Sequence, residues 1–427
     1  MLSKYLKFIP FEDDSVCIFS TRYGSSIIVE KSFLKQMEKG NIPEEERKIL
    51  SSLGFIVEDQ NKELEEVFCL IEKLNQTRNV SSFLIVLNLD CNLSCPYCYE
   101  GTQKGKKYMD KFTVERTVAF IEQKMQNGKN ISIDFYGGEP LLSYEVIVYF
   151  MEKLNQSANK FGVKITYNIV TNGTLLTCEK AESLKKLGLI SAKITIDGDE
   201  ENHNKFRPYK YGLPSFKDIL ENIKNTSSIL KIQLGGNYTK ENYKNFPKLL
   251  DRLLSEGIGP DKLNIVKFDP ISAIDKRFSH RDFSSGCVSI NEPWIAEASV
   301  YLREEILRRG YNTIPLLPSV CAVEVKDDLI INFNGDIYKC PAFLGFEEFK
   351  IGNVFKEAHF DYKMYDLNFR ENRECIECLY LPMCFGGCRY LSYLKTGKIG
   401  IDCKKDFFES TLHRFIQQDI KFRNKEN

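Results

Sequence analysis

Three cysteines stand close together in the segment CNLSCPYC, at Cys91, Cys95 and Cys98. Gaps of three and two residues are poor for disulfide pairing, and a pair would leave one thiol over. A soft metal suits the thiolates better, but a structural zinc site takes four ligands, and the nearest histidine is His203. A cubane iron–sulfur cluster has four irons, so three thiolates leave one iron open to hold another molecule. Zinc remains the alternative.

The elements that must position these cysteines alternate between strand and helix over about residues 81–310. Helices are expected between apolar strands at 81–89, 131–137, 163–172, 191–197, 231–238 and 263–271. Six such units indicate a parallel sheet covered by helices, either a flat doubly wound sheet or an incomplete barrel. In both arrangements, chemistry belongs at the carboxyl ends of the strands.

Turn segments with polar residues or glycine follow the first four of these strands. CNLSCPYC follows the first, 137–140 (GGEP) the second, 171–173 (TNG) the third and 197–198 (DG) the fourth. Each segment alone is an ordinary turn. Because all four fall at the same end of one sheet, they favour a shared site.

The C-x3-C-x2-C motif, followed one strand later by GGEP, resembles the radical S-adenosylmethionine (radical SAM) superfamily over residues ~81–270. The resemblance implies an α/β fold with a partial (β/α)6 TIM-like barrel. It also implies a [4Fe-4S] cluster whose open iron binds the amino and carboxylate groups of S-adenosyl-L-methionine. The implied cofactor-binding residues are Tyr97, Gly137, Gly138, Glu139, Asn172, Thr195, Asp197 and Arg207.

Each implied contact has its own partner on the cofactor. The 137–139 stretch is expected at the amino group, where glycines allow a close backbone approach. Asn172, Thr195 and Asp197 are expected near the ribose. Arg207 matches a position that meets the carboxylate, and the backbone at residue 97 is expected against the adenine.

Seven further cysteines follow residue 320: Cys321, Cys340, Cys375, Cys378, Cys384, Cys388 and Cys403. A turn at Gly335 predicts a hairpin that places Cys340 on its returning strand. The spacing resembles the SPASM extension of radical SAM enzymes, which implies two auxiliary clusters and three [4Fe-4S] clusters in all. A zinc ribbon at CIECLYLPMC is the alternative, but it leaves three of these cysteines unused.

The resemblance implies a division of these ligands. The second auxiliary cluster would take Cys375, Cys378, Cys384 and Cys403. The first would take Cys321, Cys340 and Cys388. Many relatives have a fourth cysteine just before the first of these, but YNTIPLLPSV contains none. The first cluster therefore uses Cys287 or keeps an open iron that could bind a substrate thiolate, and the open iron is preferred.

The other isolated cysteines, Cys17, Cys69 and Cys178, are expected to be small buried apolar residues, as is Cys287 if it binds no cluster. 

Residues 1–80 form a third region, with a predicted hairpin, two helices at 31–40 and 43–53 and a short strand at 55–58. A polar helical connector follows at 61–79. This order suggests a winged-helix-like module. The helix at 43–53 is too acidic to recognise DNA, so peptide or protein binding is expected. The expected domains are thus 1–80, 81–310 and 311–427.

Composition limits the partners. Lys plus Arg and Asp plus Glu each number 59 in 427 residues, so no nucleic acid or anionic membrane partner is expected. No apolar run approaches the ~20 residues of a membrane span. The start, MLSKYLKFIPFEDDS, does not resemble a signal peptide, and a cytoplasmic location is expected.

Relatives with this extension mostly modify peptides or proteins. The resemblance favours a maturase of ribosomally made peptides, which cleaves S-adenosyl-L-methionine to a 5′-deoxyadenosyl radical and forms a thioether or C–C cross-link. Its partners would be a precursor peptide, whose leader adds a strand to the N-terminal module, and an electron donor such as flavodoxin or ferredoxin.

Two alternatives remain open. An anaerobic sulfatase-maturase-like enzyme would oxidise a Cys or Ser side chain, but those enzymes have an aspartate where this chain has Pro341. A simple iron–sulfur electron carrier is more distant, because it needs no cofactor pocket. No catalytic base is assigned, and Asp336, Tyr338 and Glu347 are guesses from their place in the sequence.

Overall fold

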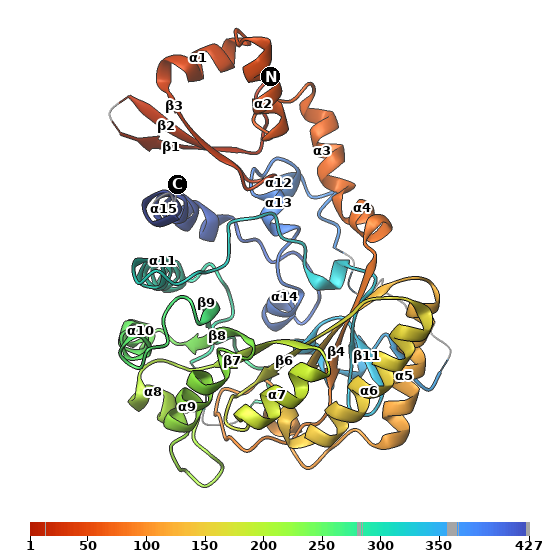
Figure 1. Cartoon of the computed structure of the whole chain (residues 1–427). Helices are drawn as coiled ribbons and strands as arrows, with labels where there is room; N and C mark the ends of the chain where they lie inside the picture. The colour runs from red at the N-terminus through yellow and green to blue at the C-terminus, as the bar shows by residue number, and fades with distance from the viewer. Residues whose placement is uncertain (13, 280–282, 284, 357–364, 366, 424–427) are drawn as a thin grey trace.

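The structure is a computed structural model of residues 1–427 (Figure 1), and it describes all of them except 13, 280–282, 284, 357–364, 366 and 424–427. Its main sheet has nine strands in the order β12-β11-β10-β4-β5-β6-β7-β8-β9. The six expected strands are confirmed as a parallel series in chain order. They are β4 (Val80–Val86), β5 (Asn130–Tyr136), β6 (Ile165–Thr171), β7 (Leu189–Thr195), β8 (Lys231–Tyr238) and β9 (Leu263–Pro270).

Helices join these strands and cover one face of the sheet (Figure 1). They are α5 (Lys111–Gln126), α6 (Tyr144–Phe161), α7 (Cys178–Lys186), α8 (Glu200–Phe206), α9 (Phe216–Thr226) and α10 (Phe246–Ser255). Side chains alternate along the strands, so Ile131, Ile133 and Phe135 of β5 are buried beneath the helices. The alternate residues, such as Tyr136, face the other side, where the cavity described below lies.

The expected hairpin at Gly335 is confirmed, and it extends the barrel sheet. Strand β10 (Asp328–Ile331) pairs parallel with β4, and β11 (Asp336–Tyr338) returns antiparallel to it. Strand β12 (Gly352–Asn353) pairs antiparallel with β11. Cys340 lies two residues beyond the end of β11, so its predicted place on the returning strand is wrong.

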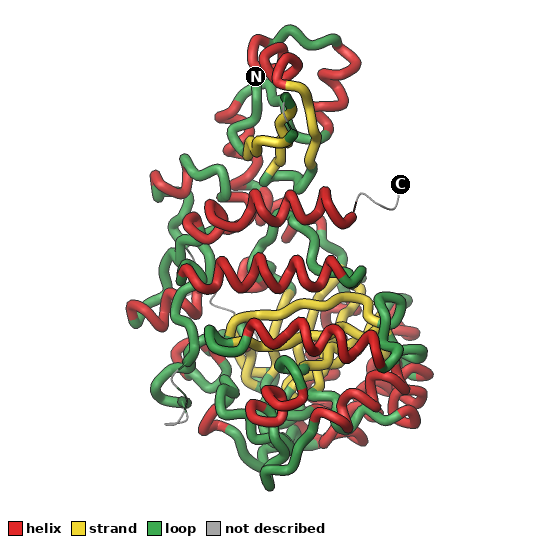
Figure 2. Tube along the Cα trace, turned by 90° about the vertical axis from the view of Figure 1, so that its left-hand side faces the viewer, coloured by secondary structure: helices red, strands yellow, loops and turns green. Residues whose placement is uncertain are grey.

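The rest of the C-terminal region is more helical than the sequence indicated. It contains α12 (Arg373–Ile376), α13 (Leu381–Cys384), α14 (Arg389–Thr396) and α15 (Lys405–Arg423). The long helix α15 packs on α11 (Pro293–Arg308), and Arg303 donates hydrogen bonds to the carbonyl of Phe415 (3.1 Å) and to Asp419 (2.7 Å). These two helices lie between the N-terminal sheet and the barrel (Figures 1 and 2).

The N-terminal region has a sheet of its own, with β1 (Leu6–Phe11), β2 (Ser15–Ser20) and β3 (Ser26–Glu30) in that order. The expected hairpin is confirmed as β2–β3. Four helices follow: α1 (Lys31–Lys39), α2 (Glu44–Ser52), α3 (Gln60–Phe68) and α4 (Leu70–Thr77). The strand expected at 55–58 is wrong, because Ile56 makes only an isolated bridge to Leu2. Both residues pack on the module's apolar core instead.

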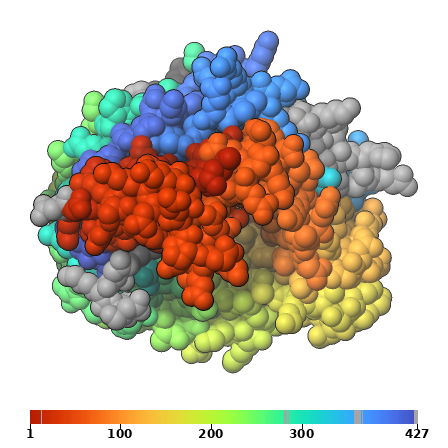
Figure 3. Space-filling view, turned by 90° about the horizontal axis from the view of Figure 1, so that it is seen from above, coloured from red at the N-terminus to blue at the C-terminus, as the bar shows by residue number. Residues whose placement is uncertain are grey.

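Seen from above, the N-terminal residues lie against the C-terminal region (Figure 3). Two apolar clusters join them, one including Tyr5 and Phe385 and the other Cys17 and Tyr380. Within the described residues, no helix is both long enough and apolar enough to span a membrane.

Candidate active site

A cavity of about 560 Å³ lies at the carboxyl ends of the parallel strands. Its walls come from the cysteine loop after β4, the turns after β5 and β6, strands β7 and β8, and the segment that follows β9. Pro341, Ala342 and Tyr390 from the C-terminal region close another side. The residues around Cys340 and Cys388 therefore border the same cavity as the first three cysteines.

Cys91, Cys95 and Cys98 all line this cavity. Burial raises the pKa of the Cys91 thiol to about 12 and also raises that of Cys98, although the positive charge of Lys104 opposes both shifts. Buried thiols of this kind ionise only beside a strong positive charge, which a bound metal supplies.

The three thiols around one cavity suit a four-iron cluster that leaves one iron open. A four-iron cluster spreads its thiolates around a larger cage. Three thiols on one cavity wall suit such a cage, and the remaining cavity leaves room for a further ligand.

Hydrogen bonds fix the cysteine loop from several sides. Asp90 accepts a bond from the Cys91 amide (2.9 Å) and one from Lys210 Nζ (2.6 Å). Asn172 Nδ2 donates to Cys91 Sγ (3.7 Å) and to Asn92 Oδ1 (2.8 Å). The side chain of Asn172 is thus committed to the cysteine loop while it also lines the cavity.

The turn after β5 runs directly against the cysteine loop. A Cβ atom on Gly138 would lie 2.2 Å from the carbonyl oxygen of Asp90, and one on Gly137 would lie 2.5 Å from that of Asn88. Residues 138 and 139 donate their amides to these same two carbonyls. Only glycine permits this approach, and both glycines line the cavity.

Glu139 has a different place from its two neighbours. Its carboxylate is fully buried and accepts hydrogen bonds from Thr171 Oγ1 (2.7 Å), the Asn172 amide (2.8 Å) and the Leu141 amide (3.0 Å). The carboxylate therefore ties the turn after β5 to the turn after β6. Any contact of residue 139 with a ligand would come from its backbone.

The structure brings Tyr97, Asp197 and Arg207 together in one hydrogen-bonded network. The Tyr97 hydroxyl donates a short hydrogen bond to Asp197 and accepts one from Arg207 (2.7 Å). Asp197 also accepts from the Asn237 amide (2.7 Å). Tyr97 and Arg207 line the cavity, as does Thr195 of β7, whereas Asp197 stands behind them. The Nε of Arg207 is buried and makes no hydrogen bond to a described residue.

The cavity also contains residues that the sequence did not single out: Glu100, Lys104, Tyr136 and Asn237. Asn237 lies at the end of β8 and obeys the rule that located the other turns, so the strand pattern offered a signal for it. Glu100 and Lys104 follow the cysteine motif without such a signal. Burial raises the pKa of Glu100 to about 7, and the charge of Lys104 opposes this shift.

None of the three residues guessed as a catalytic base, Asp336, Tyr338 and Glu347, lines the cavity. Asp336 accepts hydrogen bonds from Asn334 (2.8 Å) and Asn353 (2.7 Å) in the hairpin turn. Glu347 pairs with Lys350 at 2.5 Å on the surface. Tyr338 is buried in an apolar cluster that β4 also joins.

The later cysteines fall into two places. Cys375, Cys378, Cys384 and Cys403 line one cavity of about 420 Å³. Cys340 is half-buried, and desolvation together with the nearby thiols of Cys321 and Cys388 raises its pKa to about 12. The structure thus brings together the members of each set that the resemblance implied.

The four isolated cysteines divide differently from the expectation. Cys17 and Cys287 are buried, but Cys69 and Cys178 are exposed, so their expected burial is wrong. Both exposed residues lie at helix ends, where a small side chain faces solvent. Cys287 lies beside Ser272 and Glu292.

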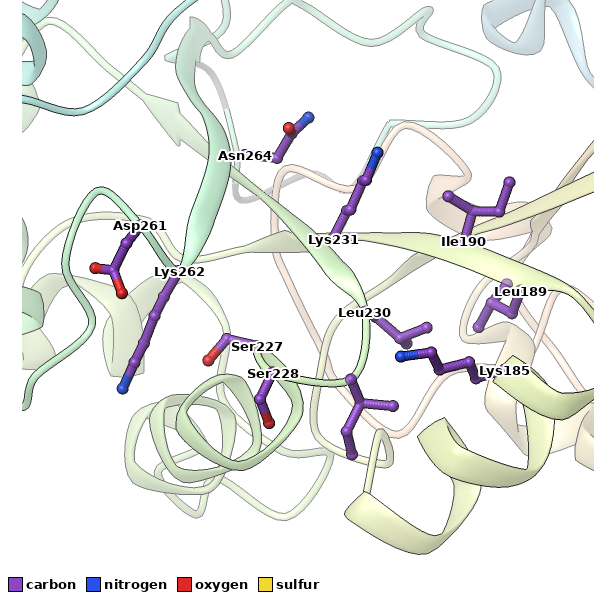
Figure 4. Close-up of a pocket in the computed structure, with 11 residues that line it drawn as sticks. Lys185, Leu189, Ile190, Ser227, Ser228, Leu230, Lys231, Asp261, Lys262 and Asn264 are labelled. Carbon is purple, nitrogen blue, oxygen red and sulfur yellow. The ribbon is translucent and has the colours of Figure 1, made fainter.

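A second cavity, of about 540 Å³, lies at the opposite ends of the strands (Figure 4). Lys185, Lys231 and Lys262 line it together with Leu189 and Asp261, near the amino ends of β7, β8 and β9. It contains no cysteine. Since the chemistry of parallel α/β sheets belongs at the carboxyl ends, the cavity beside Cys91 is the candidate site.

Comparison with known proteins gives a family match over the part of the chain that contains Cys91, Cys95 and Cys98. Residues 85–253 match the family described as the Radical SAM superfamily. The chain is 25% identical to a serine-type anaerobic sulfatase-maturating enzyme of Bacteroides thetaiotaomicron, over 74% of this chain and 84% of the relative. It is 22% identical to the radical SAM cyclopropyl synthase TigE of Paramaledivibacter caminithermalis, over 98% of this chain and 96% of the relative.

Solved structures share the fold. The structure of anSMEcpe with bound AdoMet and Kp18Cys peptide matches with a TM-score of 0.64 and 18% identity, over 81% of this chain and 99% of that one. Streptococcus suis SuiB bound to precursor peptide SuiA matches with a TM-score of 0.55 and 16% identity, over 95% of this chain and 99% of that one.

The matched stretch, residues 85–253, contains the three-cysteine motif and the strands β5 to β8 whose ends border the cavity. The chain carries a radical SAM domain and is homologous to SPASM-type radical SAM maturases. This membership implies a [4Fe-4S] cluster and S-adenosyl-L-methionine as its cofactors.

Proposed function

We propose that the chain is a maturase that installs a thioether or C–C cross-link in a ribosomally made precursor peptide. The observation that carries this proposal is the shared cavity: Cys91, Cys95 and Cys98 line one side, and residues beside Cys340 and Cys388 line another. A peptide segment held between the two cysteine sets would lie within reach of both.

In this proposal, the first three cysteines hold the cluster, and S-adenosyl-L-methionine occupies the neighbouring cavity. Together these groups supply a radical that removes hydrogen from an unactivated carbon, chemistry that no side chain can perform alone. Gly137 and Gly138 have no Cβ atom, so the backbone of this turn would lie close to the ligand. Arg207, whose Nε lacks a partner among the described residues, offers a donor for a carboxylate.

The Tyr97 ring gives the same site a rigid wall. It is buried among Phe206 and Phe283, and its hydroxyl is held by Asp197 and Arg207. With Asn172 after β6 and Thr195 at the end of β7, these residues would exclude water and fix the cofactor in one orientation.

We also propose two auxiliary [4Fe-4S] clusters, for three in all. The four-cysteine cavity supports the second of them. For the first, Cys321, Cys340 and Cys388 supply three thiolates. For its fourth corner we propose an open iron, because the segment before Cys321, YNTIPLLPSV, contains no cysteine. An external donor such as flavodoxin or ferredoxin would supply electrons.

The N-terminal region, residues 1–80, is proposed as a winged-helix-like module that binds the leader of the precursor. Strand β3 is at one edge of its sheet, and within the described chain no strand pairs with its outer edge. Ile28 on this strand is 44% exposed. An extended peptide could add to such an edge through main-chain hydrogen bonds. SuiB, whose fold this chain shares, has been solved with its precursor peptide.

The sulfatase-maturase-like function is the second candidate, and the similarity to anaerobic sulfatase-maturating enzymes favours it. Against it, Pro341 borders the cavity where those enzymes have an aspartate. A simple electron carrier would have no use for a large cavity beside an incomplete ligand set.

The test is anaerobic incubation of the reconstituted chain with dithionite, S-adenosyl-L-methionine and the peptide encoded by a short reading frame beside the gene. The proposal expects 5′-deoxyadenosine and a peptide that has lost hydrogen through a new cross-link, detected by mass spectrometry. A sulfatase-derived Cys peptide is the parallel substrate. If only the sulfatase peptide is oxidised, the second candidate replaces the first.

A further inference from the structure

The carboxylate of Glu100 lies in the cavity wall with no hydrogen-bond partner among the described residues. Glu100 is 3% exposed, and neither Oε1 nor Oε2 accepts a hydrogen bond from any residue that the structure describes. It is one of the residues that line the cavity beside Cys91, Cys95 and Cys98. A buried carboxylate without hydrogen bonds is a costly arrangement, and proteins retain one mainly where a ligand completes it.

No local structural role accounts for this side chain. Glu100 is the residue before the short 3-10 helix η1 (Gly101–Gln103), but its side chain makes no capping hydrogen bond there. Lys104 is near enough for its charge to act on Glu100, yet no hydrogen bond or ion pair joins the two among the described residues. The other buried glutamate of the cavity region, Glu139, has three donors.

The loop that carries Glu100 is clamped on both sides. The Thr102 amide donates to the carbonyl of Phe278 (2.9 Å), and a Cβ on Gly101 would lie only 1.6 Å from that oxygen. On the other side, Gln103 Nε2 donates to the carbonyl of Leu344 (3.0 Å). The loop therefore has little freedom to carry Glu100 out to solvent, and the carboxylate stays in the cavity wall.

Glu100 is not one of the expected cofactor contacts, although it lines the same cavity and is near enough to Cys98 for its charge to act there. Its neighbours include Tyr99 and Tyr136, which feel its charge, whereas Tyr97, Arg207 and Asp197 form their own network. Tyr136 is the last residue of β5. Strand β5 pairs with β4, and β4 pairs with β10 of the C-terminal hairpin.

We propose that Glu100 binds the substrate peptide, accepting a hydrogen bond from a neutral N–H or O–H donor of the residue that is modified. A neutral donor is favoured because Lys104 already places a positive charge beside Glu100, so a second cation would be repelled. This assignment rests on the peptide-maturase function proposed above. It makes Glu100 a substrate-positioning residue and assigns it no step in the chemistry.

The test compares the wild type with Glu100→Gln and Glu100→Ala, and it uses the precursor peptide that the wild type converts. Glu115→Gln is the matched control, because Glu115 lies on α5 and bonds to Tyr149 outside the cavity. Three quantities are measured: iron content with the electron paramagnetic resonance spectrum, cleavage of S-adenosyl-L-methionine without peptide, and product formed per 5′-deoxyadenosine with peptide.

Both Glu100 variants are expected to keep iron, spectrum and peptide-independent cleavage within twofold of the wild type. Product per 5′-deoxyadenosine should fall at least tenfold in Glu100→Ala and less in Glu100→Gln, which keeps one acceptor oxygen. The KM for the peptide should rise, and the control should match the wild type in all three measurements.

Two results would overturn the assignment. If Glu100→Ala forms product per 5′-deoxyadenosine within twofold of the wild type, the carboxylate does not hold the peptide. Loss of iron in both variants would show that it supports the cluster instead. If the wild type converts no peptide, the proposed function itself fails, and this outcome is distinct because it appears before any variant is compared.

Discussion

Lys4 Nζ donates a hydrogen bond of 3.1 Å to the carbonyl oxygen of Ile376. Ile376 lies between Cys375 and Cys378, so the first residues of the chain hold the loop that carries half of the four-cysteine set. Thr21 Oγ1 makes a second such bond, to the carbonyl of Leu379 (2.5 Å). The N-terminal region is therefore part of the structure around these cysteines as well as a candidate peptide-binding module.

Weakening this contact should loosen the second auxiliary site. In the double variant Lys4→Met with Thr21→Val, both bonds to the loop are lost while side-chain volume is nearly kept. We expect anaerobically purified protein to fall from about twelve iron atoms per chain towards about eight, as one four-iron cluster is lost. Iron analysis measures this. The control is Lys62→Met, at an exposed residue of α3, and unchanged iron in the double variant would contradict the prediction.

The three-cysteine set near residue 95 and the four-cysteine set that includes Cys403 are expected to have different functions. Cys95→Ala removes a proposed ligand of the S-adenosyl-L-methionine-binding cluster and should abolish cleavage of S-adenosyl-L-methionine. Cys403→Ala should leave peptide-independent cleavage within a fewfold of the wild type but stop product formation. Chromatography of 5′-deoxyadenosine and mass spectrometry of the peptide give both readings. Normal product yield from Cys403→Ala would show that the four-cysteine site takes no part in turnover.

Gly138 tests the close approach of the β5 turn to the cysteine loop. In Gly138→Ala, the new Cβ would meet the Asp90 carbonyl at 2.2 Å, so the turn or the loop must move. We expect a loss of roughly 2–3 kcal/mol in stability and weaker binding of S-adenosyl-L-methionine. Thermal unfolding and equilibrium dialysis measure these effects. Gly105→Ala is the control, since a Cβ there meets nothing within 4 Å. Equal behaviour of the two variants would refute the steric account.

His203 should make stability depend on pH. Burial, with help from the Arg207 charge, holds its pKa well below the ordinary value. Its Nδ1 accepts from the Asp197 amide (3.2 Å), and Nε2 faces Ser215 Oγ (3.0 Å), so the ring is neutral in the fold. The unfolded chain binds a proton as the pH falls through about 6.5, whereas the folded chain does not. Stability is therefore lost below that pH, by up to about 1.4 kcal/mol per pH unit.

His203→Gln removes this titration, so the variant should lose less stability than the wild type as the pH falls. Unfolding temperatures at pH 7.5 and 5.5 measure the slope for both proteins under anaerobic conditions. We expect the decrease between the two pH values to be smaller in the variant than in the wild type. An equal or larger decrease in the variant would mean that His203 does not carry the pH dependence.

The sequence located most of the barrel, because each strand is an apolar run that packs under amphipathic helices. It also located the turns after β4 to β7, since their order along the chain fixes the end of the sheet. It did not predict that β10 pairs with β4. Asp328 and Ser82 are far apart in the chain, and neither segment has a sequence feature that indicates its pairing partner. Helix α15 was also missed, as the cysteines before it suggested an irregular region.

Glu100 was missed for a physical reason of another kind. A glutamate beside a turn is normally solvated, and nothing local shows that Glu100 is buried. The loop that follows it is held by the segments at Phe278 and Leu344, which come from distant parts of the chain. Lys104 belongs to the same cavity and also depends on contacts that only the folded chain shows, whereas the strand pattern offered a signal for Asn237.

The most direct test of the account is cleavage of S-adenosyl-L-methionine by the anaerobically reconstituted chain reduced with dithionite. The account predicts 5′-deoxyadenosine and methionine in equal amounts, together with the spectrum of an iron–sulfur cluster that changes when the cofactor is added. A chain that carries only zinc, or that holds iron–sulfur clusters yet releases no 5′-deoxyadenosine, would contradict it.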